Sequence, residues 1–120
     1  MCAARILIVE DDPQILRAMI PALAVSGHSV SAVRTAREAM AQVAEAKWDA
    51  VVLDLGLPDA DGSDMIGPIS RLGLPVIVIT ARDEPGERER ALGRGAAAFL
   101  QKPFPTPELV GLVEALTETA

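Results

Sequence analysis

Five short apolar runs divide the chain, and each is followed by a stretch in which apolar residues recur with a helical period. The runs cover residues 6–9, 30–33, 50–53, 75–79 and 96–100. Because the runs are continuous rather than alternating, they predict strands that are buried on both faces of a parallel sheet. The pattern as a whole predicts a strand-helix unit that is repeated five times.

The segments between the runs place their apolar residues on one helical face, as helices that pack on a sheet do. Four such faces are formed by Ile15, Leu16, Met19, Ile20 and Leu23, by Ala36, Ala39, Met40 and Val43, by Met65, Ile66, Ile69 and Leu72, and by Leu109, Val110, Val113 and Leu116. A further helix is expected within residues 83–95. Right-handed crossovers then give an α/β fold, a doubly wound five-stranded parallel sheet inside a three-layer α/β/α sandwich.

Capping residues support these helix boundaries. The predicted starts are Asp12 before Pro13, Thr35 in a capping box with Glu38, and Thr106 before Pro107. The predicted stops are Gly27, Gly73 and Gly95. Pro21 and Pro68 lie inside predicted helices, where a proline costs about 3 kcal/mol or forces a kink. We therefore expect the first helix to bend or to end early.

Composition narrows the class of protein. A chain of 120 residues that is 50% hydrophobic can bury a single core, which predicts one domain over residues 1–120. The 11 Lys and Arg residues are scattered and outnumbered by 17 Asp and Glu, so this chain is not expected to bind nucleic acid. Its apolar runs are too short to cross a membrane. A lone Cys2, which cannot form an internal disulfide, suits the cytoplasm. One histidine, His28, argues against a Ser-His-Asp triad.

The most distinctive polar residues follow the predicted strands. They are Glu10, Asp11 and Asp12 after the first strand, Asp54 after the third, Thr80 and Ala81 after the fourth, and Lys102 and Pro103 after the fifth. The carboxyl ends of parallel strands meet at one edge of the sheet, where ligands bind. Carboxylates gathered there without His or Cys favour Mg²⁺. A carboxylate beside Mg²⁺, a lysine and a threonine can bind a phosphoryl group, with Asp54 as a possible nucleophile.

Each of these residues also has a purely structural interpretation. Asp11 and Asp12 are common in turns and helix caps, and Asp54 is a possible turn residue. Thr80 alone would be an ordinary strand end, and Lys102 alone an ordinary solvated lysine. Independent surface residues, however, have no reason to gather at the ends of four different strands. Their joint placement therefore favours the functional interpretation.

Four motifs make the chain resemble the receiver domain of bacterial two-component response regulators over essentially its whole length. They are ILIVEDD at 6–12, VLDLGLPDADG at 52–62, ITARD at 79–83 and KPF at 102–104. The run TARDE at 80–84 is most similar to receivers that precede a winged-helix DNA-binding domain. The resemblance implies a flavodoxin-like strand order, 2-1-3-4-5. The chain is then either a stand-alone receiver or the N-terminal input domain of a longer protein.

The resemblance also implies roles for individual residues. Asp54 would be the phosphoacceptor, and Mg²⁺ would be bound by Asp54, Asp12 and the backbone carbonyl of Gly56, with Asp11 holding the ion mainly through water. The phosphoryl oxygens would be held by Thr80, the amide of Ala81 and Lys102. Thr80 and Phe99 would be the switch residues, and Pro103 would follow a cis peptide bond. Gly56 and Arg82 would flank the site and control the access of water.

The function implied is a signalling switch. A sensor histidine kinase or a phosphotransfer protein would donate the phosphoryl group, and a downstream effector domain or protein would respond. The helix at 83–95, the strand with Phe99 and the last helix would form the face that partners contact. The domain would catalyse only its own phosphotransfer and its own dephosphorylation, so it is not expected to be an enzyme in the usual sense.

The same face mediates dimerisation in the most similar receivers, through ion pairs. Here the positions of the acids and of the arginine in those pairs hold Ala97, Ala98 and Leu112, which leaves Arg88 without its expected partners. Exposed ion pairs contribute only about 0–1 kcal/mol each, so their loss weakens the case for a homodimer without excluding it. A homodimer with a more apolar contact therefore stays possible.

Three other functions fit the sequence less well. An aspartate-nucleophile phosphohydrolase would need a second acid two residues after Asp54, where Gly56 stands. A flavin- or nucleotide-binding module would need a phosphate-binding loop after the first strand, where this chain is acidic. A pseudo-receiver scaffold that acts without phosphorylation would typically have lost one of the key residues. This chain keeps all five of them, namely Asp11, Asp12, Asp54, Thr80 and Lys102. The phosphorylation switch is the function that the sequence favours.

Overall fold

The chain folds as one parallel sheet with helices on both faces. The computed structural model describes residues 3–118, so Cys2 lies outside the described residues. The strands are β1 (Arg5–Val9), β2 (Ser29–Val33), β3 (Ala50–Asp54), β4 (Val76–Thr80) and β5 (Ala98–Gln101). They lie in the order β2-β1-β3-β4-β5 and all pairs are parallel. The predicted doubly wound α/β fold and its strand order are confirmed.

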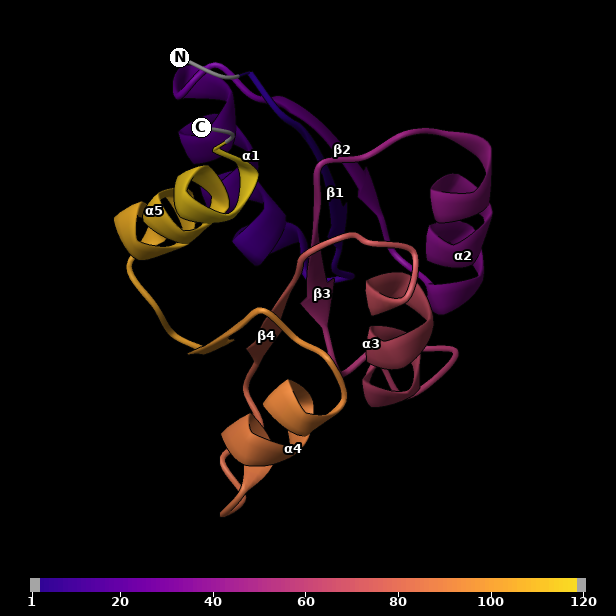
Figure 1. Ribbon diagram of the computed structural model, residues 1–120. Coiled ribbons are helices and arrows are strands. Elements are labelled where there is room, and N and C mark those ends of the chain that lie inside the picture. Colours follow the sequence, from indigo (N-terminus) through magenta and orange to yellow (C-terminus); the bar gives the residue numbers. More distant parts are fainter. Residues whose placement is uncertain (1–2, 119–120) are drawn as a thin grey trace.

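Five helices alternate with these strands. They are α1 (Pro13–Val25), α2 (Ala36–Glu45), α3 (Ser63–Ser70), α4 (Glu87–Gly93) and α5 (Thr106–Thr117). Helices α1 and α5 cover one face of the sheet, and α2 and α3 cover the other (Figure 1). The alternate side chains of each central strand enter two separate cores. One core contains Ile6 and Ile8 with α1 and α5, and the other contains Leu7 and Val9 with α2, α3 and Ala91 of α4.

Burial of the strands depends on their place in the sheet. Strands β3 and β4 are buried along their whole length, as their continuous apolar runs predict. Strand β2 is an edge strand, and none of its residues is buried. The prediction of burial on both faces is therefore wrong for β2, because an edge strand has a neighbour on one side only. The carboxyl ends of β1, β3, β4 and β5 still converge at one edge.

Two of the predicted helix starts are confirmed and one is wrong. The Asp12 side chain accepts a hydrogen bond from the Gln14 N–H at the start of α1, and Thr35 accepts one from the Glu38 N–H at the start of α2. Thr106, in contrast, is already the first residue of α5, and Pro105 occupies the cap position. Helix α1 also continues through Pro21 to Val25, so it does not end early.

The loops have two backbone features that bear on the site. The Lys102–Pro103 peptide bond is cis. Gly27, Gly73 and Gly95, the predicted stops, follow α1, α3 and α4 with positive φ angles, which glycine adopts without strain. Among residues 3–118, no helix is long and apolar enough to cross a membrane.

Candidate functional site

Four strand ends build an acidic cavity at the carboxyl edge of the sheet. The parallel register places Thr80 of β4 opposite Gln101 of β5, and Asp54 of β3 opposite Ile79. The residues that follow these strands therefore face a common space of about 500 Å³. It is lined by Glu10, Asp11, Asp12, Pro13, Asp54, Gly56, Thr80, Ala81, Arg82 and Lys102. The structure thus brings together the predicted phosphoacceptor, its predicted phosphoryl contacts and the predicted metal ligands.

Lys102 lies between two buried carboxylates. Its Nζ lies 2.6 Å from Oε1 of Glu10 and 3.3 Å from Oδ1 of Asp54. Burial disfavours the charged lysine, but its hydrogen bond with Glu10 and the charge of Asp54 outweigh that effect and raise the pKa of Lys102. The pKa of Glu10 is also raised, chiefly by burial and then by the charge of Asp54. At neutral pH the lysine therefore stays charged and partly neutralises the site.

Three carboxylates form the group best suited to a cation. Glu10, Asp11 and Asp54 each offer one oxygen, and these oxygens lie within 4.8 Å of one another. Glu10 is fully buried and Asp54 is 4% exposed, so the repulsion between them is poorly screened by solvent. An oxygen-only donor set of this kind fits Mg²⁺, which retains several water ligands. The resemblance to receiver domains implies Mg²⁺ at such an acidic pocket.

This group differs from the pair of acids predicted from the sequence. That pair is Asp11 and Asp12, whereas the clustered oxygens belong to Glu10, Asp11 and Asp54. Asp12 borders the cavity, but its Oδ1 accepts a hydrogen bond from the Gln14 N–H at 2.9 Å, as the cap of α1. Glu10 directly follows β1, and its N–H still donates to the Val33 carbonyl. The Glu10 side chain is buried beside Lys102, which the apolar pattern does not indicate.

Two of the three predicted phosphoryl contacts, Thr80 and Ala81, lie where β4 ends. Thr80 is buried at the end of β4, and its Oγ1 accepts a hydrogen bond from the Arg82 N–H at 3.0 Å. The guanidinium of Arg82 donates to the Leu55 carbonyl at 3.1 Å and pairs with Asp61 at 3.1 Å. Arg82 therefore links the Thr80 loop to the loop after Asp54. The sequence placed Glu10 at this edge of the sheet but indicated no role in the site for Glu10 or Asp61.

The predicted switch residue Phe99 and the substituted positions of the predicted dimer face are not among the residues that line this cavity. Phe99 is half-buried and packs against the core beneath α2, α3 and α4. Ala97 is exposed, while Ala98 and Leu112 are half-buried and pack against the other core. Side chains that could form the ion pairs of similar receivers are thus absent at these positions, as the sequence indicated.

The fold and the acidic edge define a doubly wound α/β domain with a site for a hard cation and an anionic group. Comparison with protein families matches residues 6–114 to the response regulator receiver domain. The transcriptional regulatory protein KdpE of Mycobacterium tuberculosis is 40% identical over 111 residues, which cover 92% of this chain and 49% of KdpE. The chain thus spans about half the length of the curated relatives it matches.

Solved structures agree with the sequence relatives. The CheY-like receiver domain protein of Methanospirillum hungatei JF-1 superimposes with a TM-score of 0.88 at 29% identity, covering 96% of this chain and 94% of that chain. The beryllofluoride-activated receiver domain dimer of NtrC4 gives a TM-score of 0.88 at 30% identity, covering 94% of this chain and 95% of that chain. The chain belongs to the receiver domains of two-component response regulators, which are regulatory signalling domains.

Proposed function

We propose that this domain accepts a phosphoryl group on Asp54 from a phosphohistidine of a sensor histidine kinase or phosphotransfer protein. The observation that carries the proposal is the position of Asp54. It is an almost fully buried carboxylate at the centre of the sheet edge, and Lys102 Nζ lies 3.3 Å from its Oδ1. A cavity of about 500 Å³ opens beside it, so an incoming phosphoryl group has both space and a cation.

In the proposed step, one carboxylate oxygen of Asp54 attacks the phosphorus atom in line with the phosphorus–nitrogen bond of the donor. A phosphorus–oxygen bond forms as that phosphorus–nitrogen bond breaks, and the imidazole leaves with the electron pair of the broken bond. Asp54 is already an anion, so no general base is needed.

The residues around Asp54 would stabilise the charge that is transferred. Lys102 would stay charged, as its raised pKa indicates, and pair with a phosphoryl oxygen. The Thr80 hydroxyl and the Ala81 N–H border the same cavity and would donate to the other oxygens. Asp11, Asp54, the Gly56 carbonyl and Glu10 would hold Mg²⁺. When bound, the ion would neutralise negative charge on the transferred group.

The consequence would be a change at the face formed by α4, β5 and α5. As the Thr80 hydroxyl moves toward the phosphoryl group, it leaves space into which the Phe99 ring can turn. A bias of a few kcal/mol is enough to shift such an equilibrium between two arrangements. A downstream effector domain or protein in the cytoplasm would recognise the altered face. A homodimer through the same face would have to use a mainly apolar contact, because Ala97, Ala98 and Leu112 supply no charges.

Intact mass spectrometry after incubation with acetyl phosphate tests the proposal. The wild type should gain one phosphoryl group when Mg²⁺ is present, and the gain should be absent without Mg²⁺ and in the Asp54→Asn variant. Failure of the wild type to form an adduct under fast quench, while Mg²⁺ still binds, would contradict the proposal. That result would favour a scaffold that acts without phosphorylation.

A further inference from the structure

Helix α4 has little apolar contact with the rest of the domain. It contains seven residues, and Ala91 is the only buried one. Leu92, the one large apolar residue of α4, is 39% exposed. Burial of apolar surface usually supplies most of the energy that holds a helix on a sheet. Polar contacts must therefore contribute much of what keeps α4 in its observed position.

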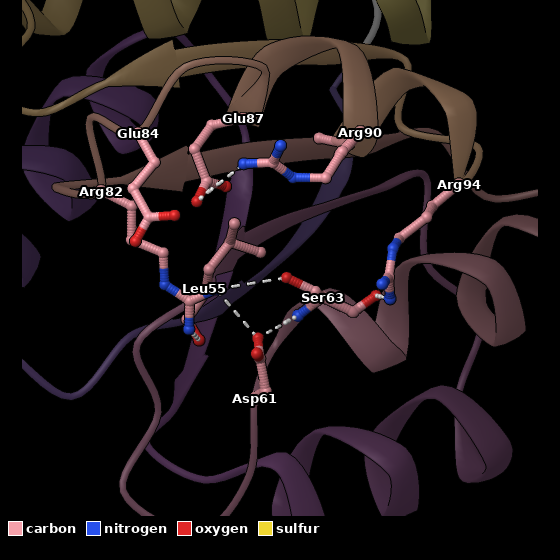
Figure 2. Close-up of a pocket in the computed structure, with 9 residues that line it drawn as sticks. Leu55, Asp61, Ser63, Arg82, Glu84, Glu87, Arg90 and Arg94 are labelled. Carbon is pink, nitrogen blue, oxygen red and sulfur yellow. Dashed lines mark hydrogen bonds and ion pairs between the residues drawn. The ribbon is translucent and has the colours of Figure 1, made fainter.

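Two arginines supply such contacts, one before α4 and one at its end. Arg82 donates to Ser63 Oγ at 3.3 Å and pairs with Asp61 at 3.1 Å. Arg94 donates to the Ser63 carbonyl at 3.1 Å and pairs with Asp64 at 3.3 Å. Figure 2 shows both guanidinium groups pointing across a cavity of about 290 Å³ toward the start of α3. We call these contacts of Arg82 and Arg94 with residues 61–64 the arginine clamp.

Residues 61–64, which the clamp contacts, are joined by hydrogen bonds to the backbone that follows Asp54. Gly56, two residues after Asp54, forms an antiparallel bridge with Asp61. The Gly62 N–H donates to the Leu55 carbonyl at 2.9 Å, and Arg82 donates to the same carbonyl at 3.1 Å. A shift in the backbone beside Asp54 is therefore transmitted directly to residues 61–64, and through them to both arginines.

The clamp is also connected to Thr80. The Arg82 N–H donates to Thr80 Oγ1 at 3.0 Å, so the position of the hydroxyl and the position of Arg82 depend on each other. Movement of Thr80 toward a phosphoryl group on Asp54 would pull the Arg82 backbone with it and strain the contacts of its guanidinium. The clamp and the phosphorylated arrangement therefore compete.

We propose that the arginine clamp holds α4 in the position that belongs to unmodified Asp54, and that phosphorylation releases α4 by breaking the clamp. This inference rests on the proposed function, because it concerns how the same site is regulated. A contact made only in the resting arrangement lowers the population of the arrangement that the phosphorylated domain adopts. It therefore weakens the apparent binding of any ligand that binds only to that second arrangement, such as a mimic of the phosphoryl group.

Beryllofluoride, a mimic of the phosphoryl group, provides the test when it is titrated with Mg²⁺ into the intact domain in a calorimeter. Arg94→Ala and Asp64→Asn each remove one partner of the outer contact, and neither residue borders the Asp54 cavity. Each variant should bind beryllofluoride about three- to fivefold more tightly than the wild type, the upper part of the range expected for exposed ion pairs. The double variant should bind no more tightly than Arg94→Ala, because Arg94→Ala already removes the pair with Asp64.

Arg90→Ala is the matched control. Arg90 lines the same cavity as Arg82 and Arg94 (Figure 2). Its side chain, however, donates to the Pro85 carbonyl just before α4 and pairs with Glu87 within α4. Its removal should leave the affinity for beryllofluoride within a factor of about two of the wild type. Thermal unfolding of every variant checks the fold. If Arg94→Ala does not fold, Asp64→Asn still tests the clamp. The Asp64 side chain is 78% exposed, so its replacement should not disturb the fold.

The outcomes separate the two proposals. Tighter binding by Arg94→Ala or Asp64→Asn, but not by Arg90→Ala, supports the clamp. Equal binding by the wild type, both clamp variants and the control overturns the clamp and leaves the proposed function intact. Absence of beryllofluoride binding in the wild type contradicts the proposed function, and the clamp with it.

Discussion

The carboxylate of Asp54 depends on close contacts with its own backbone as well as on charged neighbours. Gly62 lies against the end of β3, and a Cβ atom at this position would lie 2.5 Å from the Asp54 carbonyl oxygen and 2.8 Å from Leu55 Cα. Real Cβ atoms do not approach backbone atoms so closely. A side chain at residue 62 would therefore displace the peptide that orients the phosphoacceptor.

The first prediction follows from this contact. Gly62→Ala should lower the free energy of unfolding by about 1–3 kcal/mol, as overpacking does. It should also slow the gain of a phosphoryl group from acetyl phosphate, because Asp54 moves. Chemical denaturation and the time course of intact mass measure the two effects.

Gly111→Ala is the control for Gly62→Ala. Gly111 lies in α5, and a Cβ atom there would meet nothing within 4 Å. Alanine should therefore stabilise the helix by roughly 0.5–1 kcal/mol and leave phosphorylation unchanged. Equal behaviour of the two variants would show that the close approach at Gly62 does not position Asp54.

At the scale of elements, the loop after β3 also caps α2. Asp59 Oδ1 accepts a hydrogen bond from the Ala36 N–H at 2.8 Å, and its Oδ2 accepts one from the Arg37 N–H at 3.1 Å. Thr35 caps the same helix from its own chain segment. The N–H groups of Ala36 and Arg37 hold the pKa of Asp59 below its ordinary value of 3.8. The loop that follows the phosphoacceptor is thus anchored to α2 by an ionised carboxylate.

The second prediction concerns pH. A carboxyl group whose pKa is lowered by folding stabilises the folded state above its unfolded pKa, and the contribution is lost as the pH falls through the folded pKa. Asp59→Asn should therefore unfold at a lower temperature than the wild type at pH 7. The difference should persist down to about pH 4 and shrink below it. A difference that is independent of pH down to pH 2.5 would contradict a role for the ionised carboxylate.

At the scale of the whole molecule, metal binding and stability are linked. A ligand that binds only the folded state raises the free energy of unfolding by an amount that grows with its concentration, about 2.7 kcal/mol at one hundred times its dissociation constant. Three carboxylates that lie within 4.8 Å of one another repel, so a cation between them should stabilise the domain.

The third prediction distinguishes the two candidate sets of metal ligands. Mg²⁺ should raise the melting temperature of the wild type, and Asp11→Asn should abolish most of this increase. Asp12→Asn should retain the increase, because asparagine also caps a helix well and Asp12 is not one of the three clustered acids. A loss of the Mg²⁺ effect in Asp12→Asn but not in Asp11→Asn would restore the pair chosen from the sequence.

Most of the fold could be predicted from the order of apolar runs and helical faces. The topology rules for parallel sheets allow few arrangements of five such units, and the observed strand order is one of them. The expectation that the first helix ends early at Pro21 is wrong. Helix α1 continues through Pro21, because the contacts of Leu16, Met19 and Leu23 with the sheet outweigh the local cost of one proline. The local signal cannot include that packing energy.

The amino-acid sequence by itself determined the alternation of strands and helices and the placement of acidic, hydroxyl and lysine residues at strand ends. These properties depend on local periodicity and on the rule that parallel strands end at one edge. Only the tertiary structure decided that Glu10 rather than Asp12 joins Asp11 and Asp54. It also decided that Arg82 and Arg94 reach residues 61–64. The physical reason is that the direction of a side chain depends on the residue at which a strand ends and on long-range contacts, and neither is contained in a local pattern.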